Sequence, residues 1–214
     1  MSIKAVIWDF GGVFTTSPFE AFNRYEAKRG LPLDLIRTIN ATNPHDNAWA
    51  LFERSEIDTA GFDASFAAEA KALGHDLRGS EVLPLLSGDV RPRMVKALAA
   101  CKERFTIACI TNNVQGAGHG AGMASTTEKA AQIAEIMASF DAVIESSKIG
   151  VRKPDPRIYQ MMCELLELEP QACVYLDDLG VNCKPASQLG MTAIKVTSED
   201  QALADLSRVT GLSL

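Results

Sequence analysis

The sequence predicts an α/β protein built on a parallel β-sheet, with helices inserted after the first strand. Helical patterns separate the later strand-like runs, and strands that alternate with helices indicate crossover connections and a sheet covered on both faces. The long stretch between the first and second runs contains no convincing strand. Five short apolar runs are typical of strands: Ala5–Phe10, Phe105–Ile110, Ala142–Glu145, Cys173–Leu176 and Thr192–Val196.

Helix signals fill the stretch between the first two runs. SPFE at Ser17–Glu20 has the pattern of a capping box with a proline at the first helical position, and Gly30 follows the last turn. The stretch NPHDNAWALFE, from Asn43, has a similar start. In DTAGFDASFAAEAKALG, the helical spacing places three side chains on one face: Phe62, Phe66 and Ala70.

These signals predict two parts of the chain. Residues 16–87 are expected to form a small helical cap, whereas residues 1–15 and 88–214 form the core that contains the sheet. Gln115–Ser125 is the most glycine-rich stretch of the chain and is expected to be a flexible loop. It lacks the G-x-G-x-x-G pattern in the strand–turn–helix setting of a nucleotide site, which argues against nucleotide binding. Further helices are expected to begin near Arg91, Asp155 and Ser198.

Composition argues against several classes of protein. The 214 residues carry a formal net charge of −6 and are 47% hydrophobic and 22% charged, which is typical of a globular protein. No cluster of Lys and Arg suggests nucleic-acid binding, and no apolar run reaches the ~18 residues of a membrane span. Five scattered cysteines without a CxxC pair indicate reduced thiols, and the N-terminal stretch lacks the layout of a signal peptide. A cytoplasmic location is therefore expected.

Chemically active side chains follow four of the predicted strands. In an open parallel sheet, ligands bind beyond the carboxyl ends of the strands, so these side chains should converge at one edge. Two lysines, Lys148 and Lys153, follow the third strand and are alternative candidates for one role. The other candidates are Asp9 after the first strand, Thr111 and Asn112 after the second, and Asp177, Asp178 and Asn182 after the fourth.

This set of residues favours phosphoryl transfer. Neighbouring carboxylates repel each other unless a cation binds between them, and Mg²⁺ prefers carboxylate oxygens, water and a substrate phosphate. A lysine can neutralise the site, threonine and backbone N–H groups can donate to phosphoryl oxygens, and an aspartate can act as the nucleophile. Taken alone, Asp9 has three interpretations: a cap or turn residue, a nucleophile, or the relic of one. The ordered set at four strand ends favours the nucleophile.

The same order of motifs resembles the haloacid dehalogenase superfamily of aspartate-nucleophile phosphatases and their relatives. The resemblance rests on WDFGGV, ITNN, GVRKPDPRIY and YLDDLGVNCKPASQLGM, and it covers almost the whole chain. The last two motifs most resemble the phosphatase-like N-terminal domain of soluble epoxide hydrolases and their bacterial relatives. The family implies a Rossmann-like core in which the first strand is central, with a cap that closes over the nucleophile and largely sets the substrate.

The resemblance also implies a role for each candidate. Asp9 and Lys153 would be catalytic, because the family lysine directly precedes the proline, and Thr111 and Asn112 would bind the phosphate. Mg²⁺ would bind Asp9, the Gly11 carbonyl and Asp178. Asp177 would act through water or Lys153, and Asn182 would support the loop. The expected partner is a small phosphate ester, without nucleic acid or a membrane.

Gly11 departs from the family pattern. Family phosphatases carry a second aspartate at this position, which protonates the leaving group and later activates water. Gly11 retains the backbone carbonyl but has no side chain, so the general acid and base is missing. Three hypotheses follow: a Mg²⁺-dependent phosphatase of a small phosphomonoester, a metal-independent haloacid dehalogenase-type hydrolase, and a non-catalytic binding protein. In a phosphatase, a cap residue could supply the proton instead, with Glu20, His45 and Asp46 as candidates.

Overall fold

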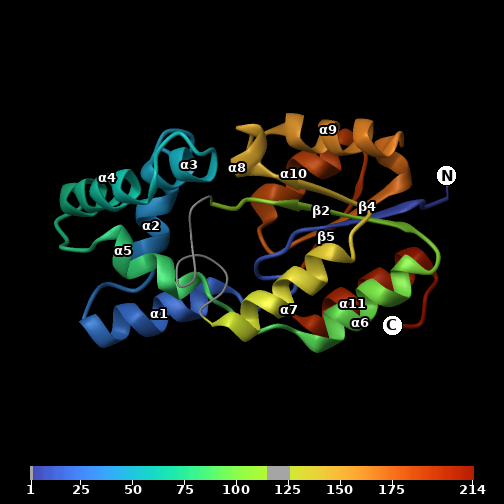
Figure 1. Cartoon of the computed structure of the whole chain (residues 1–214), viewed down its shortest axis with the longest axis horizontal. Coiled ribbons are helices and arrows are strands. Elements are labelled where there is room, and N and C mark those ends of the chain that lie inside the picture. The colour runs from blue at the N-terminus through green and yellow to red at the C-terminus, as the bar shows by residue number, and fades with distance from the viewer. Residues whose placement is uncertain (1, 115–125) are drawn as a thin grey trace.

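A five-stranded parallel sheet forms the centre of the core in the computed structural model, which describes residues 2–114 and 126–214 (Figure 1). The strand order is β3-β2-β1-β4-β5, so the first strand is central, and the predicted α/β fold is confirmed. The predicted glycine-rich loop, Gln115–Ser125, lies outside the described residues. The strands are β1 (Ala5–Trp8), β2 (Thr106–Thr111), β3 (Ala142–Glu145), β4 (Cys173–Asp177) and β5 (Thr192–Lys195).

Helices cover both faces of the sheet. One face packs against α6 (Pro92–Lys102), α7 (Thr127–Ala138) and α11 (Glu199–Thr210), and the other against α8 (Ser146–Ile149), α9 (Pro156–Leu166) and α10 (Gly180–Leu189). Side chains alternate between the faces of a strand. Val6 and Trp8 of β1 therefore belong to the first apolar cluster, and Ala5 and Ile7 to the second. Because both faces are buried, β1 is a continuous apolar run rather than an alternating one.

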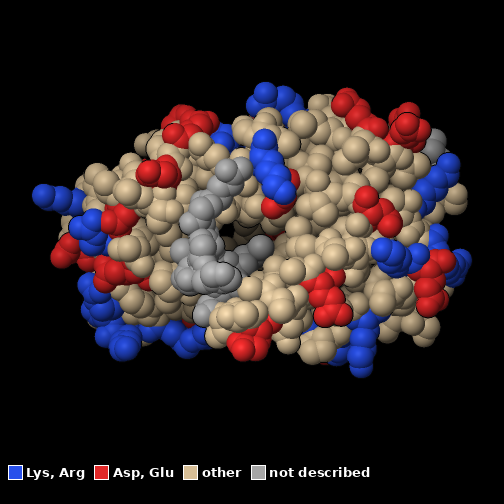
Figure 2. All heavy atoms as spheres, in the orientation of Figure 1, with Lys and Arg blue, Asp and Glu red and all other residues tan. Residues whose placement is uncertain are grey.

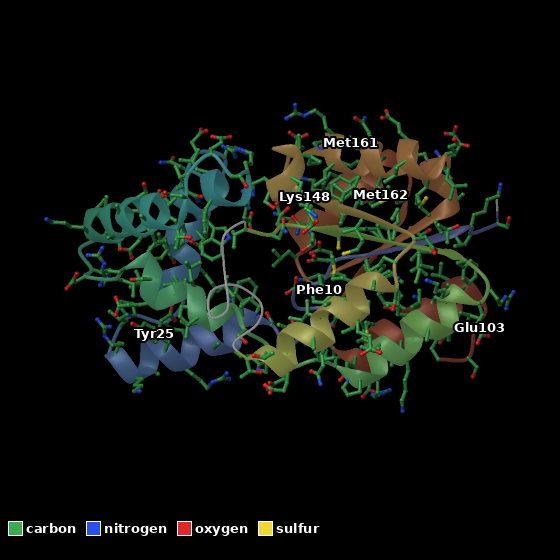
Figure 3. The ribbon with its side chains drawn as sticks, in the orientation of Figure 1. Phe10, Tyr25, Glu103, Lys148, Met161 and Met162 are labelled. Atoms are coloured by element: carbon green, nitrogen blue, oxygen red, sulfur yellow. The ribbon has the colours of Figure 1, made fainter. Side chains whose placement is uncertain are left out.

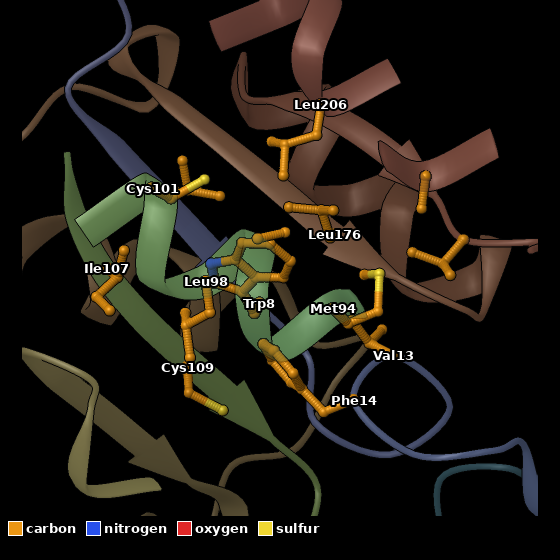
Figure 4. Packing of buried hydrophobic residues seen from close by; sticks show 14 of the residues in the cluster. Trp8, Val13, Phe14, Met94, Leu98, Cys101, Ile107, Cys109, Leu176 and Leu206 are labelled. Atoms are coloured by element: carbon orange, nitrogen blue, oxygen red, sulfur yellow. The ribbon is translucent and has the colours of Figure 1, made fainter. Parts of the chain in front are cut away.

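Trp8 anchors the end of β1 directly before Asp9. Its ring is fully buried, and the ring centroid of Phe14 lies 5.2 Å away (Figure 4). Met94 and Leu98 of α6 and Leu176 of β4 belong to the same cluster. Close packing of this kind leaves a side chain little freedom to shift. The strand end that carries Asp9 is thus fixed by the core beneath it.

The residues between β1 and α6 form a helical group beside the core. The group has an apolar cluster of its own, which includes Phe22, Ile36 and Phe52. Phe62, Phe66 and Ala70 are all fully buried on one face of α4, as their spacing predicted. The helices are α1 (Pro18–Arg29), α2 (Leu35–Ala41), α3 (Ala48–Glu53), α4 (Thr59–Ala72), α5 (Gly79–Val82) and the short 3₁₀ helix η1 (Leu83–Leu86).

Two of the expected helix starts differ in detail. Helix α1 begins at Pro18 and ends before Gly30, but no capping box forms, because the Ser17 side chain makes no cap hydrogen bond. Its hydroxyl instead lies 3.5 Å from a carboxylate oxygen of Asp178, at the carboxyl edge of the sheet. Helix α3 begins after Asn47 rather than near Asn43. The side chain of Asn47 accepts the N–H of Ala50 at 2.8 Å, and this bond sets the start.

The two chain segments that join the helical group to the core run side by side. Thr15 forms an antiparallel bridge with Val90. The N–H of Thr16 donates to the carbonyl of Asp89 at 2.9 Å. Gly88 packs so closely on Thr16 that a Cβ atom at Gly88 would lie 2.6 Å from the Thr16 carbonyl oxygen. The chain therefore passes from the core into the helical group, and back again, at one pair of neighbouring segments that follows β1.

Charged side chains of both signs are interspersed over most of the face shown in Figure 2. None of the helices in the described residues has the length and apolar character needed to cross a membrane.

A buried glutamate supplies the cap that α2 lacks. Asp34 precedes α2 with a positive φ of 61° and makes no side-chain cap bond. The fully buried carboxylate of Glu26, on α1, instead accepts the N–H groups of Asp34 and Ile36, each at 2.8 Å. Nothing in the local sequence of α2 indicates this contact, because the acceptor comes from another helix.

Replacing Glu26 by alanine should lower the free energy of unfolding by about 2–4 kcal/mol, because the buried N–H of Ile36 and the partly buried N–H of Asp34 both lose a charged acceptor. Urea denaturation followed by circular dichroism measures this loss. Glu20→Ala is the control, since the exposed side chain of Glu20 makes a surface ion pair with Arg24 at 3.9 Å. It should change the free energy by less than about 0.5 kcal/mol. Equal midpoints for the two variants would contradict the capping role of Glu26.

Candidate active site

The register of the central strands brings two carboxylates together. Trp8 of β1 pairs with Leu176 of β4, and the N–H of Asp9 donates to the Leu176 carbonyl at 2.8 Å. One residue further along each strand, Asp9 and Asp177 are neighbours, and Asp178 follows. Ligand oxygens of the three carboxylates lie within 4.8 Å of one another. The predicted convergence at the carboxyl edge of the sheet is therefore present for these residues.

Lys153 lies between two of the carboxylates. Its Nζ is 2.7 Å from an oxygen of Asp9 and 2.8 Å from an oxygen of Asp177, and its side chain is 1% exposed. Burial alone would lower the pKa of Lys153, but the charges of Asp177 and Asp9 outweigh it and raise that pKa above its usual value. Lys148, on α8, is labelled in Figure 3. Its side chain is 66% exposed and pairs with Glu145. Of the two lysine candidates, only Lys153 reaches the carboxylates.

Asp177 is held by four donors. One oxygen accepts Lys153 Nζ at 2.8 Å and the hydroxyl of Tyr175 at 2.5 Å. The other accepts the N–H of Leu179 at 2.8 Å, and the amide of Asn182 lies 3.1 Å from both oxygens. With its acceptor positions taken up by protein donors, Asp177 supports the site, and Asp9 and Asp178 are the carboxylates that can face a ligand.

Asp9 is arranged with one oxygen bonded and the other free of protein donors. Oδ1 accepts the N–H of Phe10 at 2.6 Å and Lys153 Nζ at 2.7 Å. Within the described residues, no donor is bonded to Oδ2. Burial raises the pKa of Asp9 well above its usual value, Lys153 opposes this shift, and the charges of Asp177 and Asp178 add to it. Oδ2 is the atom that could attack a substrate or bind a cation.

The donor set fits Mg²⁺. Three carboxylates face one ammonium group, so the site carries excess negative charge, and the ligand atoms are hard oxygens. Burial and the charge of Asp177 raise the pKa of Asp178 to about 6, although Lys153 and Arg91 oppose the shift. A divalent cation would relieve the repulsion that raises this pKa.

The two glycines after Asp9 lie in different surroundings. Gly12 has a φ of +74°, and a Cβ atom there would lie 2.1 Å from an oxygen of Asp178. Only glycine allows the chain to pass so close to that carboxylate. A Cβ atom at Gly11, in contrast, would meet nothing within 4 Å. Packing therefore requires the second glycine but leaves room for a side chain in place of the first.

The side chain of Asn112 makes its hydrogen bonds to other protein groups. Its oxygen accepts the N–H of Lys153 at 2.9 Å, and its amide nitrogen donates to the Lys153 carbonyl and to Glu53, both at 3.1 Å. Thr111, the last residue of β2, is buried at the same edge of the sheet. The phosphate-binding role predicted for Thr111 and Asn112 stays a prediction.

Sequence reasoning missed two residues around the site. Tyr175 lies two positions before Asp177 on β4, and the two-residue period of a strand places both on one face, a signal that could have revealed it. Glu53 comes from the helical insertion, and no local pattern links it to Asn112. The three cap residues considered as proton donors, Glu20, His45 and Asp46, are exposed.

Comparison with known proteins agrees with this geometry. A family model described as haloacid dehalogenase-like hydrolase matches residues 3–190. The chain is 38% identical over 226 residues to bifunctional epoxide hydrolase 2 of Sus scrofa, covering 100% of this chain and 40% of that protein. It thus spans about two fifths of the length of this relative.

Two further comparisons cover nearly whole chains. A phosphatase of Mycobacterium tuberculosis (strain CDC 1551 / Oshkosh) is 29% identical over 225 residues, covering 97% of this chain and 95% of that protein. The solved structure of a Bacteroides thetaiotaomicron enzyme of this family, in complex with magnesium and inorganic phosphate, has a TM-score of 0.61 at 16% identity. It covers 92% of this chain and 96% of that one. The chain belongs to the haloacid dehalogenase-like hydrolases, as its four motifs predicted.

Proposed function

We propose that the protein is a Mg²⁺-dependent phosphatase that hydrolyses a small phosphomonoester through an aspartyl-phosphate on Asp9. The observation that carries this proposal is the position of Lys153 Nζ, 2.7 Å from Asp9 and 2.8 Å from Asp177. The similarity to a mycobacterial phosphatase, and to a structure that contains magnesium and phosphate, supports it. The helical segment 16–87 acts as the cap, and the substrate is a small molecule rather than nucleic acid or a membrane.

In the first step, Oδ2 of Asp9 attacks phosphorus while Phe10 N–H and Lys153 hold Oδ1. The bond from phosphorus to the ester oxygen breaks, and the alkoxide takes its proton from water, because Gly11 offers none. Thr111 donates to the phosphoryl oxygens. Asp9, the Gly11 carbonyl and Asp178 would hold Mg²⁺, which when bound neutralises charge on those oxygens. Water then attacks phosphorus, the bond from phosphorus to Asp9 Oδ2 breaks, and inorganic phosphate leaves together with the proton from water, so that the Asp9 carboxylate is free again.

Two alternative functions are also compatible with the absence of a carboxylate at Gly11. The first is a metal-independent haloacid dehalogenase-type hydrolase, and the second is a non-catalytic binding protein. A screen of phosphate esters and haloacids, each with Mg²⁺ and with EDTA, separates the three. The phosphatase requires Mg²⁺ and releases phosphate, and the dehalogenase releases halide in EDTA. A binding protein turns over neither class. We further propose a cytoplasmic location, which five buried cysteines without a disulfide support.

Gly11→Asp should raise the turnover of alkyl phosphates more than that of aryl phosphates. A positioned acid contributes roughly 10²–10⁴ in rate, and a poor leaving group needs it most. Space for the new side chain exists, since a Cβ atom at Gly11 meets nothing within 4 Å. The measurement is kcat/KM for a series of phosphate esters of rising leaving-group pKa, which should fall steeply for the wild type and less steeply for the variant.

Gly11→Asn is the matched control, because its side chain has nearly the same size as that of aspartate but no acidic proton to transfer. It should keep the steep dependence of the wild type. A wild-type enzyme that hydrolyses alkyl and aryl esters equally fast would show that another group supplies the proton. Substitution of Glu20, His45 and Asp46 would then identify or exclude the cap residues.

A further inference from the structure

Glu53 connects the helical insertion to the core beside the site. It is the last residue of α3 and is buried. One carboxylate oxygen accepts Trp49 Nε1 at 3.0 Å, within the same helix. The other oxygen accepts two donors from the core, Arg152 Nε at 2.6 Å and Asn112 Nδ2 at 3.1 Å. We call Glu53, Asn112 and Arg152 the latch.

Contacts of the main chain reinforce the latch. The hydroxyl of Ser146 donates to the Glu53 carbonyl at 2.8 Å, and the hydroxyl of Ser55 donates to the Ser147 carbonyl at 2.9 Å. A second nitrogen of Arg152 donates to the Pro44 carbonyl at 2.9 Å. The insertion is thus fixed to the core on both sides of Glu53, and the carboxylate has little freedom to turn away.

The latch ends on the residue that supplies the ammonium group. Asn112 accepts the N–H of Lys153 and donates to its carbonyl, so its amide binds both backbone polar groups of Lys153. A carboxylate such as Glu53 can only accept hydrogen bonds. It therefore selects the orientation of the Asn112 amide in which the nitrogen faces Glu53 and the oxygen faces the Lys153 N–H. Two side-chain steps link the insertion to the backbone that carries Lys153 Nζ.

We propose that Glu53 is a positioning residue that holds Lys153 in register with Asp9 through Asn112. This role rests on the proposed phosphatase function. Glu53 is not a catalytic residue, because its oxygens are bonded to Trp49, Arg152 and Asn112 rather than to a reacting group. Misplacement of a reacting group by about 1 Å can cost about 10² in rate, so a loosened Lys153 lowers turnover without any loss of a ligand.

Glu53→Gln tests the proposal with p-nitrophenyl phosphate and Mg²⁺. It removes the charge at nearly constant volume and should lower kcat by about tenfold, with Mg²⁺ affinity unchanged in calorimetry. Glu56→Gln is the matched control, because Glu56 lies on the same segment and pairs with Arg54 of that segment at 2.5 Å. It should retain wild-type kcat. Since Glu53 acts through Asn112, the double variant with Asn112→Ala should be no slower than Asn112→Ala alone. Wild-type kcat in Glu53→Gln, or losses that multiply, would overturn the proposal.

A second measurement does not depend on turnover. Acetylation of lysines by an N-hydroxysuccinimide ester, followed by mass spectrometry, should modify Lys153 faster in Glu53→Gln than in the wild type. Lys148, whose side chain is 66% exposed, should react equally in both. Unchanged labelling of Lys153 would overturn the positioning role even if phosphate esters are hydrolysed. Conversely, a wild type that hydrolyses no phosphate ester refutes the proposed function, while the labelling still tests whether Glu53 positions Lys153.

If Glu53→Gln does not fold, Arg152→Gln removes the same 2.6 Å contact from the core side, and the same results are expected.

Discussion

Replacement of Lys153 by alanine should abolish measurable turnover and lower the free energy of unfolding by about 3–5 kcal/mol, the usual cost of removing one partner of a buried ion pair. The ammonium group is 1% exposed and contacts Asp9 and Asp177. Without it, two buried carboxylates face each other with no counter-charge. Burial already raises the pKa of Asp9, and protonation of Asp9 relieves the repulsion, so the loss of stability should be smaller at pH 5 than at pH 7. Urea denaturation at both pH values and a phosphate-release assay measure the two effects.

Lys148→Ala is the control for this variant. Lys148 is exposed and pairs with Glu145 on the surface, a kind of contact that contributes at most about 1 kcal/mol. Turnover should stay within a few-fold of the wild type. The reverse ranking of the two lysines would show that the catalytic lysine has been assigned to the wrong position.

Asp178→Ala should remove Mg²⁺ binding from the protein, and Gly12→Ala should weaken it by about 10–100-fold without removing any ligand. A Cβ atom at Gly12 would lie 2.1 Å from an oxygen of Asp178, so the carboxylate must move. Calorimetric titration with Mg²⁺ measures both effects. Because burial and Asp177 raise the pKa of Asp178 to about 6, wild-type affinity should also fall below that pH, where the carboxyl group is protonated.

Gly11→Ala is the matched control for Gly12→Ala. It adds the same methyl group one residue earlier, where nothing lies within 4 Å, and it keeps the backbone carbonyl. Mg²⁺ affinity should remain close to that of the wild type. Equal affinities in Asp178→Ala and the wild type would remove Asp178 from the ligand set, and a large loss in Gly11→Ala would refute the steric explanation.

The sequence was sufficient for those features that depend on a single segment or on strand order. Continuous apolar runs predicted the buried strands, and parallel topology carried Asp9 and Asp177 to one edge. Contacts between distant segments were beyond its reach, because hydrophobic spacing does not encode which polar groups meet. Glu26 caps a helix other than its own, and Glu53 reaches Asn112 across 59 positions.

Local patterns can also form only in part. SPFE correctly marks the start of α1, yet the Ser17 hydroxyl lies near Asp178 instead of capping the helix. The boundaries of the cap at residues 16 and 87 stay predictions, as do the roles of the individual site residues.

The bridge between Thr15 and Val90 has a consequence for how such a protein can diversify. Because the two ends of the insertion are paired side by side, the distance between them is set by the core and not by the insertion. An insertion of another length would join the same two fixed ends. The free-energy cost of closing such a connection rises by only about 0.6 kcal/mol for each doubling of its length. Glu53 comes from the insertion, whereas Lys153 and the three carboxylates around it all come from the core. Selection can therefore exchange the insertion while the arrangement of Asp9, Lys153 and Asp178 in the core stays in place.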